Sequence, residues 1–202
     1  MSPGGRSLCL GLKGVTPLEQ IAPAFIEMAH SIVWASVATV DENSRPRTRI
    51  LHPIWEWDGT DIFGWIATVP SPVKKAHLAV HPEMAVSYWT TTHDTCSAES
   101  LVEWYHDDET RAAVWNRFAN GPEPVGYEPS IIPMWADGPT SDQFAAVRLS
   151  PYRLRVMPGS VMMKGEGETL SRAATRIRRP PRQLTSACCR SRRETRCRFG
   201  SC

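Results

Sequence analysis

The amino-acid sequence predicts a mainly β domain, a small antiparallel barrel of about seven strands with about two or three small helices. Short segments that are apolar or alternating, and rich in β-branched and aromatic residues, recur between turn residues up to about residue 158. Helix-start signals precede only a few segments. All eight tryptophans lie before residue 160, so the core of the domain is expected there.

The chain begins with residues 1–15, which are rich in Gly and Ser and are expected to form a disordered leader. The sequence TPLE at residues 16–19 follows the capping-box pattern, with proline at the first helical position, so a helix is expected to start here. Pro23 is expected to kink or divide that helix, because proline lacks a backbone N–H.

The next two segments predict a β-hairpin. Residues 32–40 are apolar and β-branched and predict a first strand, and DENS at residues 41–44 supplies turn formers. Residues 45–57 then return as one long second strand. Pro53 within that strand predicts an edge position or a bulge near its middle.

The remaining elements follow in order. Residues 62–68 are apolar on both faces, which predicts a deeply buried strand, and the acidic start and apolar stripe of residues 107–119 predict a helix. Residues 120–142 are interpreted as a long proline-rich loop, of the kind that is usually functional or interfacial. Further strands are expected at residues 84–89, 97–105, 144–149 and 152–157, and a short helix at residues 72–80.

Four cations stand at two separated places in this order of elements. Arg47 and Arg49 alternate on the second strand, and Lys74 and Lys75 occupy the first turn of the short helix, which has Ser71 as its N-cap. A helix N-terminus carries partial positive charge, so lysines there are unfavourable by about 0.3–1 kcal/mol each unless an anion binds. The pattern therefore allows two interpretations, a phosphate site at this helix start or two solvated lysines that point away.

Charge is distributed unequally along the chain. The whole sequence has 23 basic and 21 acidic residues, but residues 160–202 hold ten Arg and one Lys against three Glu, so the body is acidic. An acidic body argues against nucleic acid as its main ligand. The tail, residues 159–202, has no helix or strand period and is expected to be disordered. The tail has three interpretations. It makes non-specific contact with nucleic acid or acidic partners, it forms a metal site at its cysteines, or it is translated out of the ancestral reading frame. The last interpretation is preferred.

The cysteine and histidine pattern indicates neither a disulfide framework nor a metal site. Cys9 and Cys96 are the two cysteines of the body, which favours a reducing cytosol, and no apolar run approaches the ~20 residues of a spanning helix. A Cys96 nucleophile paired with His93 and a metal pair at His77 and His81 are the alternatives. No third metal ligand is evident, so surface histidines and no metal are expected. The cysteine pattern leads to the expectation of a cytoplasmic protein.

With these features in view, residues 16–158 resemble the pyridoxamine 5'-phosphate oxidase-like family of FMN-binding split barrels, and its actinobacterial-type members rather than the genuine oxidase. The resemblance rests on an Arg-rich second strand, a buried third strand that ends in Thr, and a Lys-x-x-x-Leu-x-x-x-Pro pattern, here Lys74, Leu78 and Pro82. It implies a split antiparallel barrel, a homodimer with flavin at the subunit interface, and hydride transfer to or from a small molecule.

The same resemblance implies a set of cofactor-binding residues. Arg49 and Lys74 would bind the FMN phosphate, and Thr68 would help to hold phosphate or ribityl. The family's Ser-Arg-Lys signature is here SPVK at residues 71–74, so Ser71 would substitute for its serine and Lys75, with Arg47, for its missing cation. Ile50, Leu51 and His52 would run beside the isoalloxazine ring, largely through backbone groups. The implied set is Arg47, Arg49, Ile50, Leu51, His52, Thr68, Ser71, Lys74 and Lys75.

Several alternatives stay open at this point. His52 is a candidate catalytic side chain that could orient a ring carbonyl or relay a proton, and a hydrogen-bonded structural histidine is the alternative. A deazaflavin-dependent reductase and a non-catalytic flavin-binding or stress protein are the alternatives to an FMN oxidoreductase. Oxidation of pyridoxamine phosphate itself is not expected, because the chain after Tyr152 lacks the Trp and Arg-x-His substrate residues of that enzyme.

Overall fold

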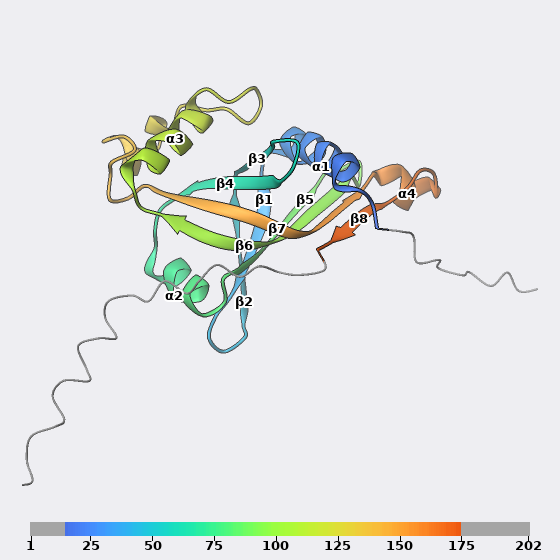
Figure 1. The fold of residues 1–202 in the computed structure, drawn as a ribbon, viewed down its shortest axis with the longest axis horizontal. Coiled ribbons are helices and arrows are strands. Elements are labelled where there is room, and N and C mark those ends of the chain that lie inside the picture. The colour runs from blue at the N-terminus through green and yellow to red at the C-terminus, as the bar shows by residue number, and fades with distance from the viewer. Residues whose placement is uncertain (1–14, 175–202) are drawn as a thin grey trace, which may run out of the picture.

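The computed structural model describes residues 15–174, which form an eight-stranded antiparallel sheet with four α-helices (Figure 1). The helices are α1 (Leu18–Ile32), α2 (Pro72–Val80), α3 (Asp108–Ala119) and α4 (Gly159–Lys164). The strands are β1 (Ala35–Val40), β2 (Pro46–Leu51), β3 (Pro53–Trp57), β4 (Ile62–Thr68), β5 (Glu83–Trp89), β6 (Thr95–Tyr105), β7 (Ala145–Met157) and β8 (Leu170–Ala173). The predicted mainly β, antiparallel class is confirmed.

The order of the strands explains how the sheet wraps around a core. The hydrogen-bonded path runs β2-β1-β5-β6-β7-β4-β3, and β8 pairs with β7 beside it. The two ends of this path, β2 and β3, are consecutive in the chain and are separated only by His52. The backbone therefore connects the two end strands directly, although β2 and β3 do not pair with each other in the described structure and the sheet is open between them.

The predicted long second strand is two strands, and the expectation of one was wrong. β2 pairs with β1, whereas β3 pairs with β4, at the other end of the path. The change of partner falls at His52, just before Pro53, which has no N–H to donate to a ladder. The proline thus marks the residue at which the chain changes neighbours. It begins β3, an end strand of the sheet path, so the predicted edge position of Pro53 is confirmed.

The predicted pair of strands at residues 144–149 and 152–157 is instead the single strand β7, so that expectation was wrong as well. β6 pairs with β7 along its whole length. Ser100 lies opposite Pro151 and Glu99 opposite Arg153, so the register shifts across Tyr152. A bulge absorbs the proline while the long partner strand holds both halves of β7 in one sheet.

Two apolar clusters fill the two sides of the sheet. In the first, α1 buries Phe25 against Trp55, with ring centroids 5.0 Å apart, and the Trp55 indole N–H donates to the Tyr88 hydroxyl at 2.8 Å. In the second, α3 and the 120–142 loop cover β4, and Phe118 and Trp135 are buried there. Pro23 lies inside the continuous helix α1, so the predicted division of that helix was wrong.

The ends of the described region meet each other. The predicted capping box does not form: Pro17 is the N-cap of α1 without a side-chain bond, and the Thr16 hydroxyl instead accepts from the Ser171 N–H at 3.1 Å. Helix α4 and strand β8 carry the sheet past residue 158, which corrects the expectation of no regular element in residues 159–174. The tail interpretations for residues 175–202 lie outside the described residues.

Candidate functional site

The candidate site lies at the start of α2, which is drawn to the left of the β1–β2 hairpin in Figure 1. As the sequence predicts, α2 starts at Pro72, and the Ser71 hydroxyl accepts from the Lys74 N–H at 3.4 Å. Residues 74, 77 and 78 share one helical face, since they are three and four positions apart. His77 and Leu78 on that face are buried, and α2 packs on β1 through it.

Arg49 reaches this site from β2. Its Nη2 donates to the Thr39 hydroxyl on β1 at 2.8 Å, while its Nη1 is buried and has no hydrogen-bond partner. Burial lowers the pKa of Arg49, and the charge of Arg47 lowers it further. A buried donor without a partner is unfavourable in free energy. The Arg49 Nη1 is therefore a donor that an anion bound next to it would satisfy.

Lys74 reaches the same site from α2. Its ammonium group donates to the Thr68 hydroxyl at the end of β4. Burial, and secondarily the charge of Arg49, lowers the pKa of Lys74 to about 8. The interior next to its side chain holds Thr68 as its polar neighbour and is otherwise apolar; the apolar lining residues are Leu51, Ile66, Leu78, Met84, Trp104 and Val147.

The two cations have no counterion in the described part of the chain. The ion pairs found among residues 15–174 involve other arginines, and no carboxylate there pairs with Arg49 or Lys74. Burial removes water from both charges, and the charge of Arg49 also acts on Lys74. Both effects disfavour the charged forms unless an anion is present. Two hydroxyls, of Thr68 and Ser71, and the N-terminus of a nine-residue helix complete the surroundings. Such a group of donors is suited to bind a phosphate.

The structure brings together four of the residues that the sequence nominates, Arg49, Thr68, Ser71 and Lys74. The other nominated residues lie around them. Arg47 and Lys75 are exposed. Burial is the main cause that lowers the pKa of His106, and the charge of Lys75 lowers it further. On β2, the Ile50 side chain is 63% exposed and Leu51 is half-buried.

His52 is the residue between β2 and β3, and its side chain lies in an aromatic cluster. Its ring centroid is 5.4–5.5 Å from those of Trp34, Phe118 and Tyr127. Its Nε2 is buried without a partner. Burial, and secondarily the charge of His30, lowers the pKa of His52 to about 4, so the imidazole is neutral at pH 7. A neutral ring at this depth can donate or accept a hydrogen bond and does not carry a charge.

Sequence reasoning missed Thr39 and His77. Thr39 was counted only as part of an apolar strand, and His77 was expected at the surface, which is wrong, because it is 6% exposed. The Thr39 hydroxyl and the His77 Nδ1 are 2.9 Å apart. One signal was available: residue 77 follows Lys74 by three positions, so any side chain there shares the face of the lysine.

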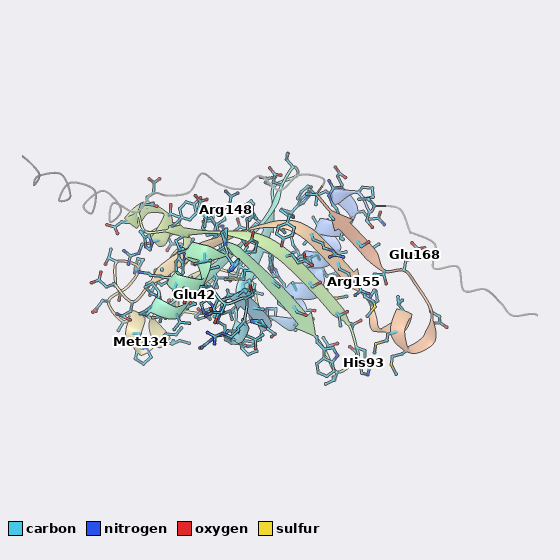
Figure 2. All side chains as sticks on the ribbon, turned by 90° about the horizontal axis from the view of Figure 1, so that it is seen from below. Glu42, His93, Met134, Arg148, Arg155 and Glu168 are labelled. Carbon is cyan, nitrogen blue, oxygen red and sulfur yellow. The ribbon has the colours of Figure 1, made fainter. Side chains whose placement is uncertain are left out.

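The other sequence candidates lie away from this site. Cys96 is buried, and burial raises the pKa of its thiol to about 12, the opposite of what a nucleophile needs. His93 lies at the α4 end of the molecule (Figure 2), where the Asp94 carboxylate next to it accepts from the Gly159 N–H at 2.7 Å. Within residues 15–174, no group of three or more His, Cys, Asp or Glu side chains could hold a metal ion, and no helix is long and apolar enough to cross a membrane.

Comparison with known proteins shows that other solved structures have this fold. No family model matches the chain, and no curated protein matches its sequence significantly. Three of the matching solved structures are the following. A general stress protein 26-related protein of the pyridoxinephosphate oxidase family, from Clostridium acetobutylicum, has a TM-score of 0.57 and 13% identity, over 77% of this chain and 95% of that one.

A pyridoxamine 5'-phosphate oxidase-related, FMN-binding protein from Nostoc punctiforme has a TM-score of 0.52 and 15% identity, over 81% of this chain and 100% of that one. A conserved hypothetical protein from Mycobacterium tuberculosis has a TM-score of 0.52 and 17% identity, over 72% of this chain and 88% of that one. At these identities the likeness establishes the fold, and the function has to be argued from the site.

Proposed function

We propose that this chain, which has the split-barrel fold of the pyridoxamine 5'-phosphate oxidase-related proteins, binds FMN and acts as a flavin-dependent oxidoreductase on a small molecule. The observation that carries the proposal is the pair Arg49 and Lys74, two partly buried cations near the start of α2 for which residues 15–174 offer no counterion. A phosphate monoester would supply the missing charge and accept from the unused Nη1 of Arg49.

The residues around the pair fit the rest of the cofactor. Thr68 and Ser71 offer hydroxyls beside the phosphate position, and β2 pairs with β1 alone among the described strands, so its other edge has free backbone groups. Ile50, Leu51 and His52 would offer that edge to the flavin ring. When bound, FMN supplies the hydride-transfer chemistry. The chain would anchor the phosphate and orient the ring. The His52 side chain lies in the aromatic cluster with its Nε2 buried, so the backbone of His52 would be the part that runs beside the flavin.

A homodimer is part of the proposal, and an exposed sheet surface supports it. Apart from Glu83 at the start of β5, the outward side chains of three adjacent strands are small or apolar and carry no charge. We call six of them the open face: Ser36, Ala38, Thr48, Ile50, Ala85 and Ser87. Ser36 lies opposite both Ile50 and Ser87, so the surface is continuous across the strands. A second copy packed on this face would cover it by two-fold symmetry and flank the β2 edge.

The cytoplasmic location expected from the sequence stays a prediction.

A flavin-binding protein without turnover is the second candidate function. A solved structure with this fold is described as related to general stress protein 26. In addition, the titratable side chains whose hydrogen bonds build the site are Arg49, Lys74 and His77, and none of these three is a carboxylate that could act as a general base.

The experiment that separates these functions starts from the purified, full-length protein. We expect a yellow protein with flavin absorbance bands, or a colourless one that acquires them with FMN, and bleaching of the bands by NADH or NADPH. Bound flavin that neither donor reduces would favour the non-catalytic protein. Failure to bind FMN, or uptake of a deazaflavin only, would contradict the proposal.

The affinity for FMN is expected to fall as the pH rises above about 8. In the free protein Lys74 loses its proton near that pH, whereas a bound phosphate dianion favours the charged lysine. Binding above pH 8 therefore requires proton uptake, and the affinity should fall by up to about tenfold per pH unit. Dissociation constants measured at pH 7, 8 and 9 by flavin fluorescence test this.

Lys74→Arg is the matched control for that titration, because an arginine stays charged throughout this range. Its affinity for FMN should be nearly constant between pH 7 and 9. An affinity of the wild-type protein that does not change with pH would contradict the assignment of Lys74 to the phosphate.

A further inference from the structure

Behind Arg49, a hydrogen-bonded chain of three side chains joins three elements of the fold. The guanidinium of Arg49 on β2 contacts the Thr39 hydroxyl on β1 at 2.8 Å, and that hydroxyl contacts the His77 Nδ1 on α2 at 2.9 Å. Thr39 is 1% exposed and His77 is 6% exposed, so water does not compete for either contact. The chain ends on the helix that also carries Lys74.

The chemistry of the donors fixes the direction of the first of these hydrogen bonds. A guanidinium can only donate, so the Thr39 oxygen accepts from Arg49. The second hydrogen bond, between the Thr39 hydroxyl and the His77 Nδ1, runs in the direction that the His77 tautomer sets. In the direction inferred here, the one hydroxyl hydrogen of Thr39 points at Nδ1, and Nδ1 accepts it.

This arrangement restricts the orientation of the guanidinium. An arginine side chain has about 2 kcal/mol of rotamer entropy, and a planar fork binds phosphate well only in one orientation. With Nη2 held by Thr39, rotation of the guanidinium is restricted, and the buried Nη1 is the nitrogen that has no hydrogen-bond partner among the described residues. The same bonds hold β2 and α2 together although Arg49 and Lys74 repel each other.

We propose that Thr39 and His77 are positioning residues that orient Arg49 toward the phosphate, and that they thereby determine the preference of the site for a phosphorylated flavin over riboflavin. The assignment rests on the proposed function, since it names how that site recognises its ligand. Neither residue touches the ligand. They act through the direction in which Arg49 presents Nη1.

The test compares the dissociation constants of FMN and riboflavin in matched variants of the full chain. Thr39→Val keeps the shape of the side chain and removes the hydroxyl, and Thr39→Ser keeps the hydroxyl. We expect Thr39→Val to weaken FMN on the order of tenfold, the usual effect of one lost hydrogen bond to a charged group, and to leave riboflavin within about twofold. Thr39→Ser should retain the FMN preference within about threefold.

At the other end of the chain, His77→Asn and His77→Phe form the corresponding pair. Asparagine can offer an oxygen where Nδ1 stands, and phenylalanine cannot, so the first should retain more of the FMN preference than the second. Urea denaturation of each variant distinguishes a selective loss from a loss of folding. Equal weakening of FMN and riboflavin, or wild-type preference in Thr39→Val, would overturn the assignment alone. A wild-type protein without preference for FMN would overturn the proposed function together with it.

A measurement without flavin tests the same chain of bonds. The imidazole ¹⁵N chemical shifts of His77 in the free protein report which nitrogen carries the proton. An unprotonated Nδ1 is expected, and a shift of that signal in Thr39→Val. A protonated Nδ1 in the wild-type protein at pH 7.5 would overturn the proposed direction of the bonds and with it the positioning role.

Discussion

The double variant Arg49→Ala/Lys74→Ala is expected to lose affinity for FMN by about 10²–10⁴-fold and to fold as the wild-type protein does. Each substitution removes one charge-assisted contact to the phosphate, worth about 1.5–3 kcal/mol. At about 1.4 kcal/mol per tenfold change, the two together account for that range. Folding should persist, because neither cation has a counterion within residues 15–174 and the lost charges are partly desolvated.

The matched control for this variant is Arg47→Ala/Lys75→Ala, which removes the same two units of charge. Both side chains are exposed, so solvent and salt screen their effect on the site. We expect the control to weaken FMN by less than about fivefold, and riboflavin to bind both double variants equally. Circular dichroism establishes that both are folded. Tight FMN binding by Arg49→Ala/Lys74→Ala would show that the phosphate lies elsewhere, and a larger loss in the control would move it to Arg47 and Lys75.

Substitution on the open face is expected to abolish the proposed dimer. In Ala85→Arg/Ser87→Arg, two exposed small side chains become large and charged. In an isologous interface each substitution occurs twice around the symmetry axis, so four like charges would be brought together without partners. Multi-angle light scattering should change from the mass of two chains to that of one. Because the β2 edge lies beside the open face, FMN retention should fall with the dimer.

A pair of substitutions at exposed positions elsewhere serves as the control. Ile131→Arg/Met134→Arg also replaces exposed apolar side chains, 70% and 54% exposed, in the loop beside α3. It should leave both the mass and the FMN affinity unchanged. A wild-type protein that is monomeric at micromolar concentration would contradict the dimer. A dimer that survives Ala85→Arg/Ser87→Arg but not the control would place the interface on the loop.

Local signals in the sequence were sufficient for several elements of the fold. The bounds of β4 and α2 were predicted as the structure has them, because Ser71 and Pro72 start the helix and an uninterrupted apolar run defines the strand. The errors at Pro53 and Pro151 have a common cause. A proline removes one donor, and whether the strand ends there depends on its partner: β2 and β3 have different partners, whereas β6 spans both halves of β7.

The site divides in the same way. Arg49, Thr68, Ser71 and Lys74 were nominated from a charge anomaly at a helix start and from a family resemblance. The structure brings all four together. Thr39 and His77 were missed, since a threonine in an apolar strand and a histidine on a short helix have no local signal of function.

By itself, the sequence determined the antiparallel β class, the helix start at Ser71 and the presence of unmatched cations on two neighbouring elements. These are local properties, set by turn formers, caps, side-chain period and charge. Only the tertiary structure decided which cation faces which, that His52 turns away into an aromatic cluster, and that Thr39 meets His77 across 38 positions of the chain. Such contacts depend on strand pairing and on the packing of α2 against β1, which no stretch of residues encodes alone.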